Sequence, residues 1–308
     1  MVLVISILLI TIEALIIFFL LFIRLSKPIK PEIVSSNTPE KVAAFYNQTT
    51  DKFLQVYGEI IQAFRTTNVE DYLKYTIQSA GILNGMKIID AGCGVCGPAS
   101  FIAQQFPDVQ INACTISEVQ KKLGEEKIKE KNVSAQIKIA LGDYHKLNEL
   151  FENETHDRVI FLESFGHSNN KAKAIEASWK VLKPGGKLYI KDLFIRESKN
   201  DWEQLRINHI CGQINTAYEY QIGDLNKVIS AIRQQGFIIN FIRPPQVDLS
   251  TFEHLTISND FQNLFNIGKI ESWDDYVFPI DFFEILAEKP LHNTEEQKHL
   301  YFMNRDAT

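Results

Sequence analysis

A glycine-rich turn, Asp90-Ala91-Gly92-Cys93-Gly94-Val95-Cys96-Gly97, carries the clearest chemical signal in the sequence. It follows a short apolar segment, 87–90, and precedes a segment typical of a helix, 98–106. Gly92, Gly94 and Gly97 have the G-x-G-x-x-G spacing, which lets the backbone approach a nucleotide-containing ligand closely. The turn therefore predicts a ligand site at the end of a strand.

The acid inside this turn narrows the choice of ligand. A carboxylate at Asp90 repels phosphates and suits a ligand with a positive charge, such as an α-amino group. A nicotinamide-binding fold also needs an acid about 20 residues further on to hold the ribose hydroxyl. The next strand ends in Ala113-Cys114-Thr115-Ile116-Ser117, and the acid Glu118 comes slightly later. A nicotinamide oxidoreductase is therefore disfavoured.

The segment KIIDAGCGVCG resembles motif I of the class I S-adenosylmethionine-dependent methyltransferases. Within that group, other segments resemble the sterol and terpenoid (geranyl diphosphate-type) C-methyltransferase branch. These are Thr115-Ile116-Ser117-Glu118-Val119-Gln120, Leu141-Gly142-Asp143-Tyr144, the segment from Phe161 to His167, Val181-Leu182-Lys183-Pro184-Gly185-Gly186, and Tyr46-Asn47-Gln48-Thr49-Thr50-Asp51. Cyclopropane-forming relatives have a histidine on the fifth strand, where this chain has Lys191-Asp192, which argues against that reaction.

The resemblance implies S-adenosyl-L-methionine as cofactor. Its expected contacts are Asp90, Gly92, Cys93, Gly94, Thr115, Ile116, Gln120, Gly142, Asp143 and Tyr144. Backbone amides from Gly92 to Gly94 should approach the cofactor, and Asp90 should orient the turn or accept from the amino group. Thr115 and Gln120 are expected at the ribose and Asp143 at the adenine amine. The alternative role of Thr115, Gln120 and Asp143 is loop capping, and that of Asp90 is a hydrogen bond to its own backbone.

The expected catalytic residues are Glu163, His167 and Tyr46. A sulfonium is already reactive, so the enzyme mainly supplies alignment and a dry pocket. If an alkene carbon is methylated, Glu163 could stabilise the developing carbocation and then take a proton, with Tyr46 and Tyr57 as cation–π partners. If nitrogen or oxygen is methylated, His167 is the natural base. The alternative role of His167 is to cap the following helix.

Strands and helices alternate from about residue 69 to residue 287. This pattern predicts a Rossmann-like methyltransferase fold with a seven-stranded, mostly parallel sheet and helices on both faces. The domain is expected to span 39–290, with aromatic-rich cap insertions near 195–222 and 244–278 and a polar tail at 291–308. Ligands of such sheets bind outside the carboxyl ends of the strands.

The N-terminus predicts a transmembrane anchor at residues 1–24. Residues 2–23 are apolar apart from Ser6, Thr11 and one charged residue, Glu13, and their length suits a membrane-spanning helix. Arg24, Lys27 and Lys30 follow it, which predicts a single-pass membrane protein with a cytoplasmic catalytic domain. Residues 25–38 have linker composition. A cleaved signal peptide is the alternative.

Composition limits the partners. The formal net charge of -6 argues against nucleic-acid binding as the main function. Cys93 and Cys96 form a C-x-x-C pair with no second pair after it, so no metal site is expected. The predicted function is C-methylation of a small lipophilic, terpenoid or sterol-like substrate. The alternatives are an N- or O-methyltransferase of a small metabolite and an inactive cofactor-binding scaffold. A homo-oligomer is compatible with the sequence. The sequence does not identify the methyl acceptor, nor does it show whether a divalent metal and a diphosphate substrate are used.

Overall fold

The computed structural model describes residues 37–62, 66–247 and 279–291. The chain divides into two units, Met1–Ser35 and Ser36–Thr308, and all described residues belong to the second. Within the described ranges, no helix combines the length and the apolar character needed to cross a membrane. The predicted anchor, 1–24, lies outside these residues, as do most of the linker, of the second insertion and of the polar tail.

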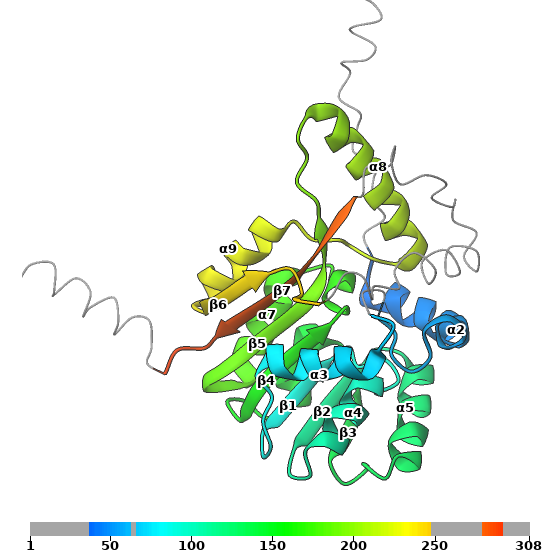
Figure 1. The fold of residues 1–308 in the computed structure, drawn as a ribbon, viewed down its shortest axis with the longest axis vertical. Helices are drawn as coiled ribbons and strands as arrows, with labels where there is room; N and C mark the ends of the chain where they lie inside the picture. The colour runs from blue at the N-terminus through cyan, green and yellow to red at the C-terminus, as the bar shows by residue number, and fades with distance from the viewer. Residues whose placement is uncertain (1–36, 63–65, 248–278, 292–308) are drawn as a thin grey trace, which may run out of the picture. The chain divides into compact units, whose positions relative to one another are not determined.

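Seven strands of the described residues form one sheet, in the order β3-β2-β1-β4-β5-β7-β6 (Figure 1). Their bounds are β1 Lys87–Ala91, β2 Gln110–Thr115, β3 Ile137–Leu141, β4 His156–Leu162, β5 Leu182–Ile195, β6 Ile238–Arg243 and β7 Ile280–Glu288. Strands β1 to β5 pair in parallel, and β7 is antiparallel to both β5 and β6. The predicted seven-stranded, mostly parallel sheet is therefore confirmed.

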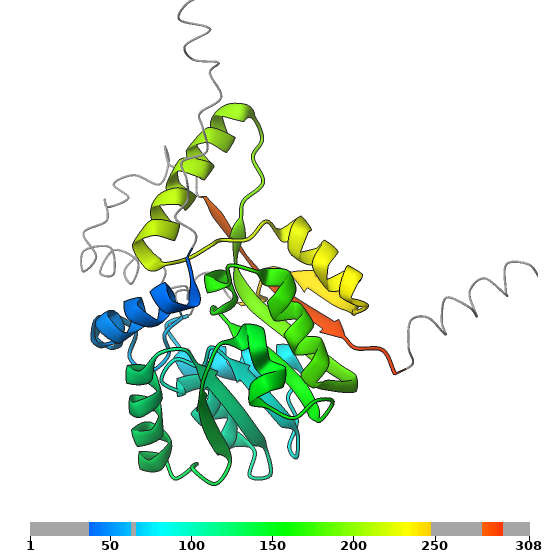
Figure 2. The same ribbon diagram turned by 180° about the vertical axis from the view of Figure 1, so that it is seen from behind.

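Helices cover both faces of the sheet because successive strand residues point to opposite sides. In β1, Ile88 packs in the core beneath α3 (Val69–Ala80), α4 (Gly97–Gln105) and α5 (Glu118–Glu130). Its neighbour Ile89 packs in the second core, beneath α7 (Lys171–Val181) and α9 (Leu225–Gln235). Figure 1 shows the first layer in front, and Figure 2 shows the second from behind.

Two further helices lie beyond the carboxyl ends of the strands (Figure 1). Helix α2 (Pro39–Tyr57) is capped by Thr38 and has a proline in its first turn, as helix starts prefer. It ends at Tyr57 because Gly58 follows with φ +62°. Helix α8 (Asp201–Tyr218) occupies the first predicted insertion, 195–222, and contacts the α2 region through Tyr218.

The connections that reach these strand ends are short. The 3₁₀ helix η1 (Tyr144–Lys146) and helix α6 (Leu147–Leu150) follow β3, and the 3₁₀ helix η2 (Phe165–His167) follows β4. Strand β5 is long, because Leu182 already pairs with β4 and the far end pairs with β7 up to Ile195. The loops that follow β1 to β4 therefore meet at one edge of the sheet.

Candidate functional site

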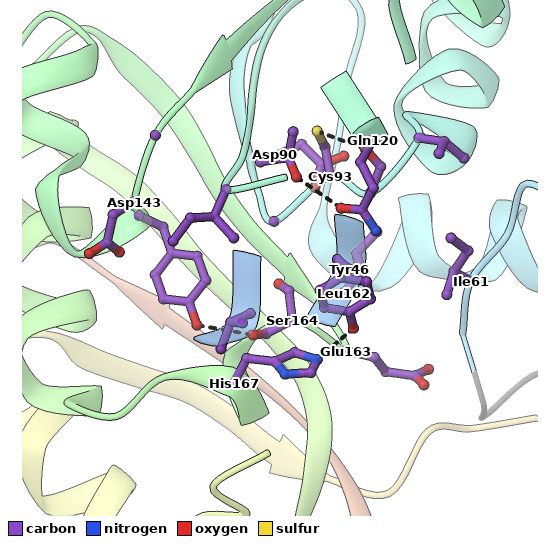
Figure 3. Close-up of a pocket in the computed structure, with 18 of the residues that line it drawn as sticks. Tyr46, Ile61, Asp90, Cys93, Gln120, Asp143, Leu162, Glu163, Ser164 and His167 are labelled. Atoms are coloured by element: carbon purple, nitrogen blue, oxygen red, sulfur yellow. Dashed lines mark hydrogen bonds between the residues drawn. The ribbon is translucent and has the colours of Figure 1, made fainter. Parts of the chain in front are cut away.

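A pocket opens at the carboxyl ends of β1, β2, β3 and β4, under α2. Its empty space is about 890 Å³ when the open solvent at its mouth is included. The predicted cofactor contacts line it, as do Glu163, His167 and Tyr46. Tyr57 is not among its described lining residues and packs beside Phe53 in an apolar cluster. In Figure 3, Asp90, Cys93 and Gln120 lie toward one end, and Glu163 and His167 lie toward the other. The structure thus brings the predicted residues together, while their roles stay predictions.

The glycine turn crosses from β1 to α4 in a tight path. Gly92 has φ +87°, and a Cβ built there would lie 2.5 Å from the Cβ of Ser164, so only glycine fits. The amides of Gly92 and Cys93 both donate to the carbonyl of Cys114, at 2.9 Å each. These two hydrogen bonds join the turn to β2. The close approach of Gly92 to Gly94 to a cofactor stays a prediction.

Asp90 lies at the base of the turn with 2% of its surface exposed. Burial raises the pKa of its carboxyl group to about 7. Its Oδ2 has no hydrogen-bond partner among the described residues, so this oxygen accepts no hydrogen bond from the backbone of Asp90. A buried, unpartnered carboxylate oxygen next to a pocket is suited to a cationic ligand group, since such a group would restore its ionised form.

The loop after β2 arranges three polar side chains. Thr115 Oγ1 donates to Gln120 Oε1 at 2.9 Å, which leaves the amide nitrogen of Gln120 to serve as a donor in the pocket. Ser117 caps α5 through the amide of Gln120, at 3.1 Å. Asn47 of α2 accepts from the hydroxyl of Ser117 at 2.7 Å and from the amide of Val119 at 3.3 Å. Helix α2 is thereby fastened to the start of α5.

The loop after β3 holds Asp143 above the pocket wall. Asp143 Oδ1 accepts from the backbone of His145 at 2.9 Å and lies 2.6 Å from its Nδ1. Burial alone would raise the pKa of Asp143, but these hydrogen bonds hold it below the usual value. The hydroxyl of Tyr144 donates to the Ser164 carbonyl at 3.2 Å and so links this loop to the end of β4.

Glu163 directly follows β4 with φ +58°, a left-handed conformation that costs a non-glycine residue about 1–3 kcal/mol. Its Oε1 forms an ion pair with Nζ of Lys191, at 3.2 Å, with side chains 4% and 0% exposed. Burial lowers the pKa of Lys191, and Glu163 partly offsets this. The carboxylate is thus held at the pocket wall by a buried cation behind it.

His167 does not cap α7, because Asn170 occupies that position. Its Nδ1 lies 3.0 Å from the carbonyl of Glu219, which can only accept, so Nδ1 carries the proton. Its Nε2 therefore accepts from the hydroxyl of Tyr46, at 2.7 Å. Burial lowers the pKa of His167 to about 4. His167 is accordingly a neutral acceptor that orients Tyr46.

The geometry agrees with what sequence comparison finds. The sequence profile described as mycolic acid cyclopropane synthetase matches residues 65–272, more than half of the chain. The chain belongs to the mycolic acid cyclopropane synthetase family. Among curated relatives, sterol 24-C-methyltransferase ERG6 of Saccharomyces cerevisiae is 28% identical over 194 residues, 60% of this chain and 48% of the relative. The chain spans about half the length of the curated relatives it matches.

Solved structures share the fold of this family member. The [4+2]-cyclase SpnF has a TM-score of 0.66 at 19% identity, covering 83% of this chain and 97% of that one. Geranyl diphosphate C-methyltransferase from Streptomyces coelicolor has a TM-score of 0.60 at 15% identity, covering 82% and 97%. At these identities the likeness concerns the Rossmann-like methyltransferase fold alone.

The sequence did not predict all of the residues that line the pocket of this family member. No local sequence pattern marks Pro39 and Val42 of α2, or Glu59, Ile61 and Gln62 after it, although all five line the pocket. Ser164 was also missed. Gly92 could have indicated a close neighbour of this kind, because its position leaves no room for a Cβ atom. No group of three or more His, Cys, Asp or Glu side chains in the described part of the chain is arranged to hold a metal ion.

Proposed function

We propose that this protein is an S-adenosylmethionine-dependent methyltransferase that methylates a carbon atom of a small lipophilic substrate. The observation that carries the proposal is the pocket itself, in which the buried Asp90 and the carboxylate of Glu163 line opposite regions beside a glycine turn. Family membership and the sterol 24-C-methyltransferase relatives support the same reaction class.

The residues around the turn fit the proposed cofactor. Asp90 offers an unpartnered carboxylate oxygen for its amino group, and Gln120 offers an amide donor for the ribose hydroxyls. Asp143 would receive the adenine amine. When bound, S-adenosylmethionine supplies an electrophilic methyl group on a sulfonium. The fixed side chains around it would exclude water and align the acceptor.

The opposite end of the pocket suits an alkene acceptor. Glu163 forms an ion pair with the buried Lys191. Its carboxylate would stabilise positive charge that develops on the substrate and then accept the proton. Tyr46 lines the same pocket and donates its hydroxyl to His167, and its ring would add cation–π stabilisation. No covalent enzyme intermediate is needed.

The charge of the lining favours an uncharged substrate. Among the described lining residues, Glu59, Asp90, Asp143 and Glu163 are acids, and no Lys or Arg is present. A diphosphate would be repelled by these acids, and none of the described lining residues is a Lys or Arg that could hold it. We therefore favour a neutral terpenoid or sterol-like alkene over a diphosphate ester.

A second candidate is N- or O-methylation of a small metabolite. The hydrogen bond from Tyr46 to the neutral Nε2 of His167 could relay a proton from a substrate amine or hydroxyl. Burial raises the pKa of Tyr46 and lowers that of His167, and both shifts weaken such a relay at neutral pH. Mass spectrometry of the methylated product separates the two candidates.

We also propose that residues 1–24 anchor the protein in a membrane, with the catalytic domain on the cytoplasmic side. The proposal is supported by the apolar run and by Arg24, Lys27 and Lys30 after it. A lipophilic acceptor dissolved in the bilayer would then be concentrated near the enzyme. Carbonate extraction of membranes that contain the full chain tests this: release into the supernatant would contradict an anchor.

The first experiment is calorimetric titration of the full chain, in detergent, with S-adenosylmethionine and with NAD as control. Binding of the former alone supports the proposal, and transfer of a labelled methyl group to lipophilic acceptors then identifies the substrate. Failure of the folded protein to bind S-adenosylmethionine would overturn it. Binding without transfer to any acceptor class would point to an inactive scaffold.

A further inference from the structure

Gln62 lies in the segment that connects α2 to α3, directly over the pocket. Its surface is 2% exposed, and it lines the pocket together with Ile61. Its backbone amide donates to the carbonyl of Ile60 at 2.9 Å, which holds the residue in a tight bend. Gln62 is therefore a fixed part of the pocket wall.

Lys191 determines which way the amide of Gln62 faces. The Nζ of Lys191 donates to Oε1 of Gln62 and to the hydroxyl of Tyr72, and it forms the ion pair with Glu163. An ammonium group can only donate, so the oxygen of the Gln62 amide must face Lys191. The nitrogen, Nε2, must then face the other way.

This nitrogen has no hydrogen-bond partner within the described part of the chain. An amide N–H that is buried without an acceptor destabilises the protein, and such groups in native structures call for a specific explanation. The second N–H of the same amide also needs a hydrogen-bond acceptor. A ligand oxygen in the pocket would satisfy it.

We propose that Gln62 binds the methyl acceptor by donating a hydrogen bond to a neutral oxygen of that molecule. Gln62 and Glu163 both contact the same Nζ, so their side chains lie within about two hydrogen-bond lengths, roughly 6 Å, of each other. The oxygen must therefore lie a few bonds from the carbon that reacts opposite Glu163. The acceptor class is a lipophilic alkene with an alcohol, ether or carbonyl oxygen close to its double bond. This inference rests on the proposed function.

Two ligands that differ only in the oxygen test the assignment. One is geranyl methyl ether, whose oxygen can only accept a hydrogen bond, and the other is the hydrocarbon with the same geranyl chain and no oxygen. Their dissociation constants are measured on the full chain loaded with S-adenosylhomocysteine. We expect the wild type to bind the ether about tenfold more tightly, as one satisfied buried donor would give.

The variant Gln62→Glu keeps an acceptor for Lys191 and removes the donor, so it should abolish this preference. Gln78→Glu makes the same chemical change on the exposed side of α3 and should keep it. Affinity for S-adenosylhomocysteine should stay within twofold in both variants. If the wild type lacks that affinity, the proposed function fails. Equal binding of the two ligands by the wild type, binding of neither, or an unchanged preference in Gln62→Glu would overturn the role of Gln62 alone.

Discussion

Replacing Asp90 by asparagine should stabilise the ligand-free protein at alkaline pH while weakening cofactor binding. Burial raises the pKa of Asp90 from 3.8 to about 7. A shift of about 3 units corresponds to roughly 4 kcal/mol of destabilisation when the group is ionised. The folded state binds this proton more tightly than the unfolded state, so the free energy of unfolding falls as pH rises from about 4 to about 7 and stays low above that.

The asparagine side chain would carry no charge, but its amide would lose hydrogen bonds worth about 1–3 kcal/mol. The net gain of Asp90→Asn at pH ~8.5 is therefore about 1–3 kcal/mol, or a rise in melting temperature of several degrees for a domain of this size. At pH ~5 the gain should vanish, because wild-type Asp90 is then neutral. Affinity for S-adenosylmethionine should fall about tenfold or more at pH ~8.5, since a charge-assisted hydrogen bond is lost.

Thermal denaturation at both pH values, with and without S-adenosylmethionine, measures these effects. Asp143→Asn is the matched control, because hydrogen bonds from His145 lower the pKa of Asp143 and its replacement should destabilise the protein at pH ~8.5. An Asp90→Asn variant that is less stable than wild type at alkaline pH, or that binds the cofactor unchanged, would refute the reasoning.

Three further expectations concern the opposite end of the pocket and the glycine turn. Glu163→Gln should reduce transfer of labelled methyl to the identified acceptor by about a hundredfold or more and leave calorimetric S-adenosylmethionine affinity within threefold; retained turnover would contradict its role as proton acceptor. Gly97→Ala should cost about 2 kcal/mol or more in denaturant unfolding, since its Cβ would lie 2.1 Å from a backbone oxygen. Gly124→Ala, whose Cβ would meet only a flexible side-chain end at 3.0 Å, should cost much less. Because His167 is neutral above pH ~5, His167→Gln should not move an acidic midpoint of kcat/KM near pH 7, and loss of that midpoint in the variant would assign it to His167.

The sequence predicts well those site residues that directly follow a strand. Asp90, Thr115, Asp143 and Glu163 each lie at or just after the end of a strand, and parallel strands bring such positions to one edge. Apolar segments, glycines and capping residues mark these strands locally, so their order along the chain was enough to place the residues together.

Other features depend on contacts that no local pattern encodes. Gln62 meets Lys191 across 129 residues, and this pairing arises only when the segment after α2 folds back over the sheet. The occupied amides of Gly92 and Cys93 follow from the register of β1 and β2, in which Ala91 pairs with Cys114. The sequence alone could not decide whether His167 caps α7, because His167 and Asn170 both lie shortly before that helix.

Helix α2 connects the two ends of the pocket mechanically. Asn47 fastens it to Ser117, which caps the helix that carries Gln120, while the adjacent residue Tyr46 reaches toward His167. A ligand at either end should therefore restrict the motion of α2. The second ligand to bind then loses less conformational entropy, because α2 is already ordered. Such coupling is reciprocal, so the cofactor should raise the affinity for the acceptor by the factor by which the acceptor raises affinity for the cofactor. The expected signature is that the dissociation constant of each ligand falls by the same factor when the other ligand is bound.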